Sequence, residues 1–195
     1  MTHYYSADQE AQSRPFRIRV RTRDQELDLW SDAGVFSKEE LDAGTALLTD
    51  MCALRPGWRV HDLGCGIGVV GIVAKRAEPA CTVLCSDVSR RAVETTRKNV
   101  AALGLDIEVR ESDGYAAIPE QFDTVLLNPP YVAGRETIYR LMMEAHAHLA
   151  PGGLLQLVAR HAKGGEMLKK KMLELFGNCD DSRRQGGFRV YVGER

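Results

Sequence analysis

From Trp58 onward the chain alternates between short apolar runs of strand length and longer stretches whose apolar positions have helical spacing. Strands that alternate with helices are joined by crossover connections, which build a mostly parallel sheet covered by helices on both faces. The expected fold is therefore α/β and doubly wound, and the Gly186-Gly187 pair adds a C-terminal antiparallel hairpin. The predicted strands are 58–62, 81–87, 107–110, 122–127 and 154–159, followed by the hairpin strands near 179–184 and 188–192. The predicted helices are 67–77, 89–103, 136–149 and 166–176.

The first 57 residues have a different pattern. The segment FRIRVRTR at 16–23 alternates strictly, and as a strand it places four guanidiniums on one side, those of Arg17, Arg19, Arg21 and Arg23. Asp24-Gln25 can turn the chain into a second strand at 26–30, and a helix is expected at 42–54. We therefore divide the chain into an N-terminal extension with an Arg-rich β-hairpin, residues 1–40, and a main domain, residues 41–195. An edge strand protected by its charge would show the same alternation.

The composition is that of one soluble globular domain, with 195 residues, of which 44% are hydrophobic and 27% charged. The net charge of −1 predicts no general affinity for nucleic acid, but the charge is unevenly spread. Residues 1–23 carry five arginines against two acids, and residues 160–195 carry nine basic residues against five acids. Two basic ends can form a local binding patch, although two solvated surfaces explain the same distribution.

Cysteine usage and hydropathy indicate the compartment. The chain has five cysteines, an odd number, and no C-x-x-C pair. This favours reduced thiols in a cytoplasmic protein over disulfides or a zinc site. The histidines have no visible ligand partners, so no metal is expected. The sequence shows no signal peptide and no apolar run of membrane-spanning length, so no membrane partner is expected either.

A glycine-rich loop follows the strand at 58–62 and opens a helix. Gly64, Gly66 and Gly68 let the backbone turn tightly and approach a ligand without an intervening β-carbon. Asp87 comes 19 residues after Gly68, at the end of the next strand, where a carboxylate can bind ribose hydroxyls. Asp62, two residues before the first glycine, suits the ammonium of an amino-acid moiety better than a pyrophosphate.

These features resemble the class I S-adenosylmethionine-dependent methyltransferases over about residues 41–195. The resemblance implies a Rossmann-like methyltransferase sheet, with S-adenosylmethionine as the cofactor and S-adenosylhomocysteine as its product. The family's DxGxGxG loop, its ribose-binding acid and its adenine-contacting acid all have counterparts in this sequence. The cofactor-binding residues that follow are Asp62, Gly64, Gly66, Gly68, Asp87, Ser112, Asp113 and Asn128.

The apolar run 122–127 ends abruptly in Asn128-Pro129-Pro130-Tyr131, where open α/β sheets bind their ligands. Prolines cannot donate to a sheet ladder, so the strand must end there. Family members with this tetrapeptide methylate planar amino or amide nitrogens. The Asn128 side-chain oxygen and the Pro129 carbonyl can accept the hydrogens of such a nitrogen, Pro130 stiffens the loop, and Tyr131 offers a stacking face. The resemblance therefore implies that these four residues are catalytic.

The segments Gly34-Val35-Phe36-Ser37 and Leu41-Asp42-x-Gly44-Thr45 resemble the small-domain methyltransferases related to the guanine-N2 methyltransferases of small-subunit ribosomal RNA. This implies an N-methyltransferase acting on the exocyclic N2 of a guanine in RNA, with small-subunit ribosomal RNA as the partner. The chain looks more like the compact, single-domain archaeal-type members than like bacterial members with an extra amino-terminal copy. The expected substrate-binding residues are Arg17, Arg19, Arg21, Arg23, Phe36 and Ser37.

Two other functions remain open. A protein glutamine-N5 methyltransferase acting on a release factor or ribosomal protein also carries Asn-Pro-Pro-Tyr, but usually has a helical substrate domain where this chain has the predicted Arg-rich hairpin. A non-catalytic S-adenosylmethionine-binding scaffold that docks on RNA would not need the intact glycine loop and tetrapeptide. A DNA adenine methyltransferase would need a target-recognition domain, for which the 195 residues leave no room.

Overall fold

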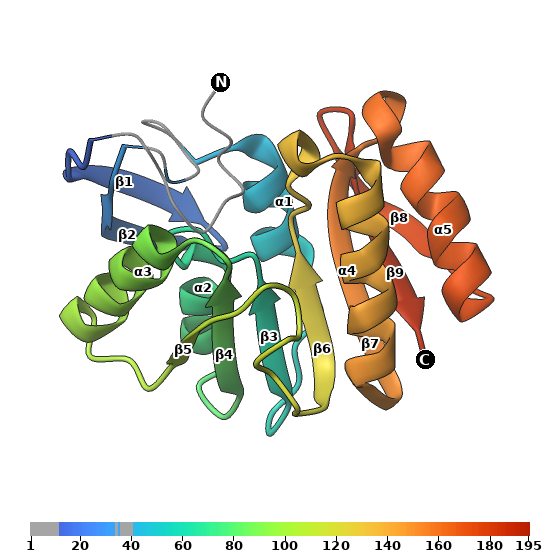
Figure 1. Cartoon of the computed structure of the whole chain (residues 1–195), viewed down its shortest axis with the longest axis horizontal. Helices are drawn as coiled ribbons and strands as arrows, with labels where there is room; N and C mark the ends of the chain where they lie inside the picture. Colours follow the sequence, from blue (N-terminus) through green and yellow to red (C-terminus); the bar gives the residue numbers. More distant parts are fainter. Residues whose placement is uncertain (1–11, 34, 36–40) are drawn as a thin grey trace.

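The computed structural model describes residues 12–33, 35 and 41–195 (Figure 1). Within these ranges a seven-stranded sheet has the order β5-β4-β3-β6-β7-β9-β8. Strands β3 to β7 are parallel, whereas β9 is antiparallel to β7 and β8 is antiparallel to β9. The bounds are β3 Arg59–Leu63, β4 Thr82–Asp87, β5 Glu108–Glu111, β6 Phe122–Leu127, β7 Leu149–Arg160, β8 Asp180–Gln185 and β9 Phe188–Glu194.

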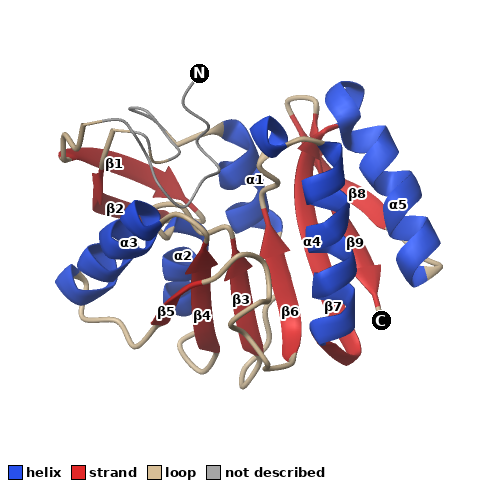
Figure 2. Cartoon of the chain, in the orientation of Figure 1, coloured by secondary structure: helices blue, strands red, loops and turns tan. Residues whose placement is uncertain are grey.

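Helices cover both faces of this sheet, because alternate strand residues point to opposite sides and both sides are apolar. In β6, Leu126 belongs to one hydrophobic cluster, whereas Val125 and Leu127 belong to the other. Helices α1 (Ala43–Met51), α2 (Val69–Ala77) and α3 (Arg90–Ala102) contribute to the first cluster, and α4 (Arg135–His148) and α5 (Glu166–Phe176) to the second. Figure 2 shows α4 in front of the strands and α2 behind them. The predicted α/β, doubly wound fold is confirmed.

The expected N-terminal hairpin is also present, as a separate two-stranded sheet of β1 (Phe16–Thr22) and β2 (Gln25–Ser31). The turn lies at Arg23-Asp24 rather than at Asp24-Gln25, and both turn residues have positive φ values, 48° and 55°. Its inward side chains, including Val20 and Leu29, join the same hydrophobic cluster as α2 and α3. The predicted boundary after residue 40 falls at the end of a range that is not described, and the domain division stays a prediction.

Two element ends differ from the sequence prediction by three residues or more, and the others lie within two residues of it. Strand β7 begins at Leu149 instead of 154, with an irregular register against β6 between Phe122 and Thr124. Helix α1 ends at Met51 instead of 54, because distant side chains bind the backbone that follows it. Gln156 of β7 accepts from the Ala53 N–H and donates to the Ala53 carbonyl, each over 2.8 Å. These hydrogen bonds to the Gln156 side chain thus replace the last predicted turn of the helix.

The five cysteines are all free, and four of them are buried, as expected for core thiols. No group of three or more His, Cys, Asp or Glu side chains in the described ranges is arranged to hold a metal ion. None of the helices in those ranges is both long and apolar enough to cross a membrane.

Candidate functional site

The glycine loop, β4 and the tetrapeptide meet at the carboxyl edge of the parallel strands. Leu63, the last residue of β3, pairs with Leu127 of β6 on one side and with Ser86 of β4 on the other. The loops that follow these three strands are therefore neighbours. This register brings the predicted cofactor loop, Asp87 and Asn128 to one edge, although they are far apart in the sequence.

The glycine loop has the backbone conformation that its residues predict. Gly64, Gly66 and Gly68 have φ values of 74°, 58° and 86°, in the left-handed region that favours glycine. A β-carbon at Gly68 would lie 2.7 Å from the Thr96 methyl group, so that glycine is also required for packing. A β-carbon at Gly64 would meet no atom within 4 Å, so the space beside this part of the loop is open to a ligand.

Two residues of α3 that the sequence analysis did not single out hold this loop. Thr96 donates its hydroxyl hydrogen to the Gly66 carbonyl over 2.9 Å, and the Asn99 amide donates to the Ile67 carbonyl over 2.9 Å. Asn99 also accepts from the Trp30 N–H and donates to the Trp30 carbonyl, at 2.7 and 2.9 Å. One buried side chain therefore connects the loop to the N-terminal hairpin. No local sequence signal indicates these contacts.

Asp62 is buried at the end of β3, under the first turn of α2. Its Oδ2 accepts from the Gly71 N–H over 2.8 Å and from the Cys85 thiol over 3.9 Å, which leaves Oδ1 without a hydrogen-bond partner in the described part of the chain. Burial raises the pKa of Asp62 to about 7, because the ionised form is poorly solvated there. A cationic group beside Oδ1 would favour the ionised form.

Asp87 is the second carboxyl group of the site. Its Oδ2 accepts from the Gly66 N–H over 2.9 Å, and its Oδ1 accepts from the Ser89 N–H over 2.8 Å. Burial raises the pKa of Asp87, and the two backbone hydrogen bonds oppose that rise. Each oxygen keeps a further lone pair, so the carboxylate can still accept hydrogen bonds from ribose hydroxyls.

Ser112 and Asp113 follow β5 and are less clearly placed for a ligand. The Ser112 hydroxyl donates to the Gly114 carbonyl over 2.9 Å and accepts from the Ala117 N–H over 3.1 Å, so it stabilises the turn. The Asp113 side chain is 56% exposed and forms an ion pair of 2.6 Å with Arg140 of α4. Nothing in the sequence indicated the contact with Arg140. The cofactor-binding role of Ser112 and Asp113 stays a prediction.

The tetrapeptide projects from the end of β6. Pro129 is buried, whereas the Tyr131 side chain is 44% exposed at the start of a short 3-10 turn, Tyr131–Ala133. Partial burial raises the pKa of Tyr131 to about 12, so the phenol is neutral at physiological pH. A neutral ring with an exposed face is suited to stacking on a planar group.

Asn128 is held from the other side by α1. Its amide nitrogen lies 2.9 Å from the Thr45 hydroxyl oxygen and 3.5 Å from each carboxylate oxygen of Asp42. Asp42 is the N-cap of α1, where it accepts from the N–H groups of Gly44 and Thr45. Asp42 and Thr45 belong to the segment that resembles the family and to the predicted helix 42–54, and no site role was predicted for either residue.

Three of the four predicted RNA-binding arginines share the outer face of the hairpin. Arg17, Arg19 and Arg21 are exposed, but each forms an ion pair with an acid of β2. The distances are 3.4 Å from Arg17 to Asp28, 3.4 Å from Arg19 to Glu26 and 3.3 Å from Arg21 to Glu26. The face therefore combines both signs of charge, and exposed pairs of this kind contribute little to stability.

The expectation of four guanidiniums on one side is wrong for Arg23. This residue belongs to the turn, and its guanidinium donates to the carbonyls of Thr49 and Cys52 at 2.7 and 3.1 Å. Arg23 thereby supplies donors to the carboxyl end of α1, where backbone carbonyls lack helical partners. Phe36 and Ser37, the other predicted substrate contacts, lie outside the described residues.

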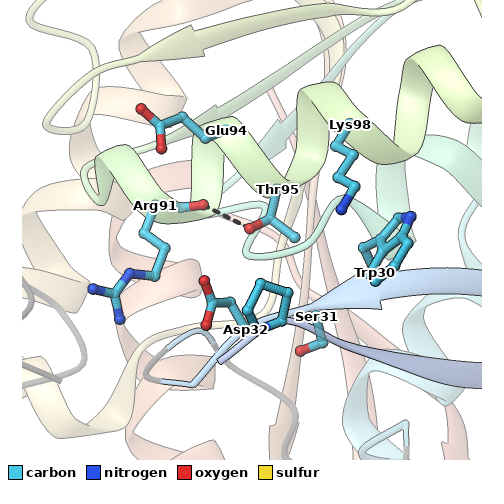
Figure 3. A pocket seen from close by; sticks show the side chains of 8 residues that line it. Trp30, Ser31, Asp32, Arg91, Glu94, Thr95 and Lys98 are labelled. Atoms are coloured by element: carbon cyan, nitrogen blue, oxygen red, sulfur yellow. Dashed lines mark hydrogen bonds between the residues drawn. The ribbon is translucent and has the colours of Figure 1, made fainter. Parts of the chain in front are cut away.

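A small hollow of about 160 Å³ lies between β2 and α3 (Figure 3). The Lys98 ammonium stands 3.4 Å from the centre of the Trp30 ring, and the Thr95 hydroxyl donates to the Arg91 carbonyl. Asp32 accepts from the Ser13 hydroxyl and the Arg14 N–H, each over 2.6 Å. These polar groups already have partners within the protein. None of the predicted site residues lines the hollow.

Residues 26–192 match the family model described as Methyltransferase small domain. The chain belongs to this methyltransferase family. The matched residues include β2 except its first residue, the central sheet except the last two residues of β9, and every residue of the carboxyl-edge site. The resemblance to class I methyltransferases that the glycine loop and the tetrapeptide indicated is therefore confirmed.

Curated members of this family support the same relationship. Over 183 residues the chain is 40% identical to Ribosomal RNA small subunit methyltransferase C of Pseudomonas aeruginosa, an alignment that covers 92% of this chain and 54% of the relative. Over 197 residues it is 36% identical to the protein of the same name from Pseudomonas putida, covering 96% and 58%. The chain thus spans about half the length of the curated relatives it matches.

Solved methyltransferase structures share the fold. One is a 16S ribosomal RNA N2 guanine methyltransferase of Thermus thermophilus in complex with S-adenosylmethionine and guanosine, with a TM-score of 0.79 and 23% identity. That match covers 96% of this chain and 52% of the other. Another is a ribosomal protein methylase of Lactobacillus delbrueckii, with a TM-score of 0.68, 20% identity and coverages of 83% and 81%. At these identities the likeness concerns the fold.

Proposed function

We propose that the chain is an S-adenosylmethionine-dependent N-methyltransferase that modifies the exocyclic N2 of a guanine in RNA, most favourably in small-subunit ribosomal RNA. The observation that carries this proposal is the register of the central sheet. It brings Asn128 to the same edge as the glycine loop and Asp87, with Leu63 pairing between Leu127 and Ser86. A methyl donor and an amino acceptor would therefore meet in front of β3 and β6.

The residues at this edge fit S-adenosylmethionine. The open space beside Gly64 accommodates a ligand close to the backbone, and Asp87 has lone pairs for ribose hydroxyls. The Oδ1 of Asp62 can accept from an ammonium group, which suits an amino-acid moiety. When bound, the cofactor supplies an electrophilic methyl group on a sulfonium. Family membership and the names of the curated relatives support the same choice.

The tetrapeptide suits the acceptor that this chemistry requires. The lone pair of an exocyclic base nitrogen is delocalised into the ring, which makes the nitrogen a weak nucleophile. The Asn128 side-chain oxygen and the Pro129 carbonyl accept its two hydrogens and turn the lone pair toward the methyl group. S-adenosylmethionine held by Asp62, the glycine loop and Asp87 would supply the methyl group to the nitrogen and leave as S-adenosylhomocysteine, and the nitrogen would release one of its hydrogens to solvent as a proton.

Positioning accounts for most of the rate under this mechanism. Tyr131 presents a neutral, partly exposed ring on which the base plane can stack after the base leaves its helix. No strong base is needed before methyl transfer, because the nitrogen becomes acidic only once it carries the methyl group. The two hydrogens of guanine N2 match these two acceptors, as those of other exocyclic amino groups do. The choice of guanine is supported by the name of the matched 16S ribosomal RNA N2 guanine methyltransferase.

A direct comparison of substrates tests the proposal. Labelled S-adenosylmethionine is offered with small ribosomal subunits, total transfer RNA and release factor in parallel, and the products are digested and analysed. We expect labelled N2-methylguanosine from the small-subunit RNA, and its loss in an Asn128→Ala variant. Label in glutamine of the release factor alone would overturn the RNA assignment. Cofactor binding without any labelled product would instead indicate a non-catalytic scaffold.

Protein glutamine-N5 methylation is the second candidate. The ion pairs on the N-terminal hairpin favour it. Glu26 and Asp28 pair with the three outward arginines and so reduce the positive charge available to RNA. A glutamine side chain also presents a planar nitrogen with two hydrogens, so it satisfies the same two acceptors. The names of the relatives, which are ribosomal RNA methyltransferases, support RNA as the first candidate.

A further inference from the structure

We propose that Asp42 and Thr45 are positioning residues that fix the Asn128 amide in one orientation, with its oxygen toward the acceptor nitrogen. The inference deepens the proposed function, since it explains why Asn128 presents an acceptor rather than a donor to the substrate. The starting observation is a hydrogen-bonded network of three side chains, two at the start of α1 and one after β6. Asp42 and Thr45 start α1, and Asn128 follows β6, 83 residues after Thr45.

The number of hydrogens on each group determines the direction of each hydrogen bond in this three-residue network. The Asp42 carboxylate accepts from the backbone N–H groups of Gly44 and Thr45, at 2.9 and 3.0 Å, and also from the Thr45 hydroxyl. A hydroxyl has one hydrogen, and that of Thr45 is used on Asp42. The Thr45 oxygen can then only accept from its second partner. The amide nitrogen of Asn128, 2.9 Å away, is the donor that it needs.

The reverse orientation of the amide has no donor to satisfy it. With the two ends exchanged, the Asn128 oxygen would face the lone pairs of Thr45 and the carboxylate of Asp42. Several acceptors would then face one another without a hydrogen between them, in a site where Thr45 is buried and Asp42 and Asn128 are half-buried. The network therefore selects one of two amide orientations that have nearly the same shape.

The consequence falls on the reacting nitrogen. Every hydrogen bond of the Asn128 side chain within the described ranges involves its amide nitrogen, so Oδ1 is left for a ligand. In the reversed amide, an NH2 group would face the hydrogens of the acceptor amine and could not draw out its lone pair. A fixed orientation avoids this unproductive state before the substrate arrives, which is the advantage of preorganisation.

The start of α1 is built to place the Asp42 carboxylate. A β-carbon at Gly44 would lie 3.0 Å from the Asp42 Oδ1 and 3.2 Å from the Phe188 ring of β9, so glycine leaves room for both. Asp42 itself caps the helix with extended backbone, φ −68° and ψ 147°. The same residue thus ends a loop, starts a helix and orients a side chain of another element.

Kinetics of isosteric variants test the consequence. Thr45→Val removes the hydroxyl and keeps the shape, and we expect kcat to fall roughly ten- to one-hundred-fold with KM and cofactor affinity nearly unchanged. Thr45→Ser keeps the hydroxyl and should restore most of the turnover. Asp42→Asn keeps the helix cap, because Asn caps helices as well as Asp, but it supplies a donor to the network and should also lower kcat. A Thr45→Val variant with the kcat of the unmodified protein would overturn the proposal.

A matched control separates this effect from general loss of a buried hydroxyl. Thr95→Val makes the same substitution in α3, where the hydroxyl, among the residues that the structure describes, donates only to the Arg91 carbonyl of its own helix. Its kcat should stay within about two-fold of the unmodified protein. Thermal unfolding of all four variants identifies any loss of folded protein. An equal loss of kcat in Thr45→Val and Thr95→Val would assign the effect to helix stability and overturn the positioning role.

Nuclear magnetic resonance of the side-chain amides tests the orientation without any substrate. The Asn128 NH2 signals, assigned by their absence in Asn128→Ala, should exchange slowly with water and shift in Thr45→Val but not in Thr45→Ser. Rapid exchange in the unmodified protein, or signals unaffected by Thr45→Val, would overturn the proposal. If no RNA is methylated, the proposed function fails, whereas this measurement still decides whether Thr45 and Asp42 orient the amide.

Discussion

Asp87 at the end of β4 accepts a hydrogen bond of 2.9 Å from the backbone N–H of Gly66 in the glycine loop. The bond joins the ends of neighbouring parallel strands across 21 positions of sequence. It fixes the carboxylate beside the loop before any ligand binds. Asp87 therefore has two roles, one in shaping the loop and one in the proposed contact with ribose hydroxyls.

Replacing Asp87 should affect both roles. We expect Asp87→Ala to weaken S-adenosylmethionine binding by about 1–3 kcal/mol, because hydrogen bonds to a charged group are lost. The free energy of unfolding should fall by about 1–3 kcal/mol as well, since the Gly66 and Ser89 N–H groups lose their acceptor. Calorimetric titration and denaturant unfolding measure the two effects. Asp106→Ala, at an exposed position, is the control, and unchanged cofactor affinity in Asp87→Ala would contradict the ribose assignment.

Asn128→Ala should leave cofactor affinity largely intact and reduce turnover by roughly a hundred- to a thousand-fold. The reason is that the Asn128 oxygen is proposed to act on the acceptor nitrogen in the transition state, and loss of one such preorganised group has effects of about this size. Steady-state kinetics with the unmodified substrate RNA separate the effect on kcat from the effect on KM. A change confined to KM would assign Asn128 to uniform substrate binding instead.

Asp62 should make the stability of the protein depend on pH. Its pKa is about 7 in the folded state and about 4 in an unfolded chain, so the folded state binds the proton more tightly. The stabilisation from this proton is fully present below about pH 4 and is lost as the pH rises through 7. We expect Asp62→Asn to remove this component, measured as the free energy of unfolding at pH 5 and pH 8.

His61, beside Asp62 on β3, has the opposite effect. It is buried between the Tyr115 and Ser86 hydroxyls, and burial lowers its pKa to about 3. Its contribution is present above about pH 6.5 and is lost as the pH falls toward 3. The comparison of the unmodified protein with Asp62→Asn cancels this effect because both contain His61. Identical pH dependence in the two proteins would show that Asp62 does not titrate near neutrality.

The outward arginines provide a test of RNA binding. Arg19→Gln with Arg21→Gln should weaken binding to all RNA sequences and flatten its salt dependence by roughly 0.7 per lost single-strand phosphate contact. The methylated nucleotide should stay the same, because phosphates carry no base information. Arg90→Gln, an exposed arginine of α3 that also pairs with an acid, is the matched control. Unchanged affinity at low and high salt would make the hairpin face ordinary solvated surface and favour the glutamine substrate.

The sequence by itself determined the elements whose signals are local. Strand β6, Phe122–Leu127, and helix α5, Glu166–Phe176, have the predicted bounds, because prolines or glycines flank a segment with one regular spacing of apolar residues. Ser89 caps α3 as predicted, and the three loop glycines have positive φ values, which agree with the tight turn that was expected of them. These features depend on neighbours within a few residues, so the pattern along the chain contains them.

Only the tertiary structure decided how the site residues are held. Thr45 reaches Asn128 across 83 positions, Asn99 reaches Trp30 across 69, and Arg140 reaches Asp113 across 27. Arg23 does not lie on the predicted basic face, because its guanidinium binds the carbonyls at the end of α1. A hydrogen bond needs a partner at a fixed distance and angle, and the packing of sheet and helices, rather than the local pattern, sets which distant residue stands there.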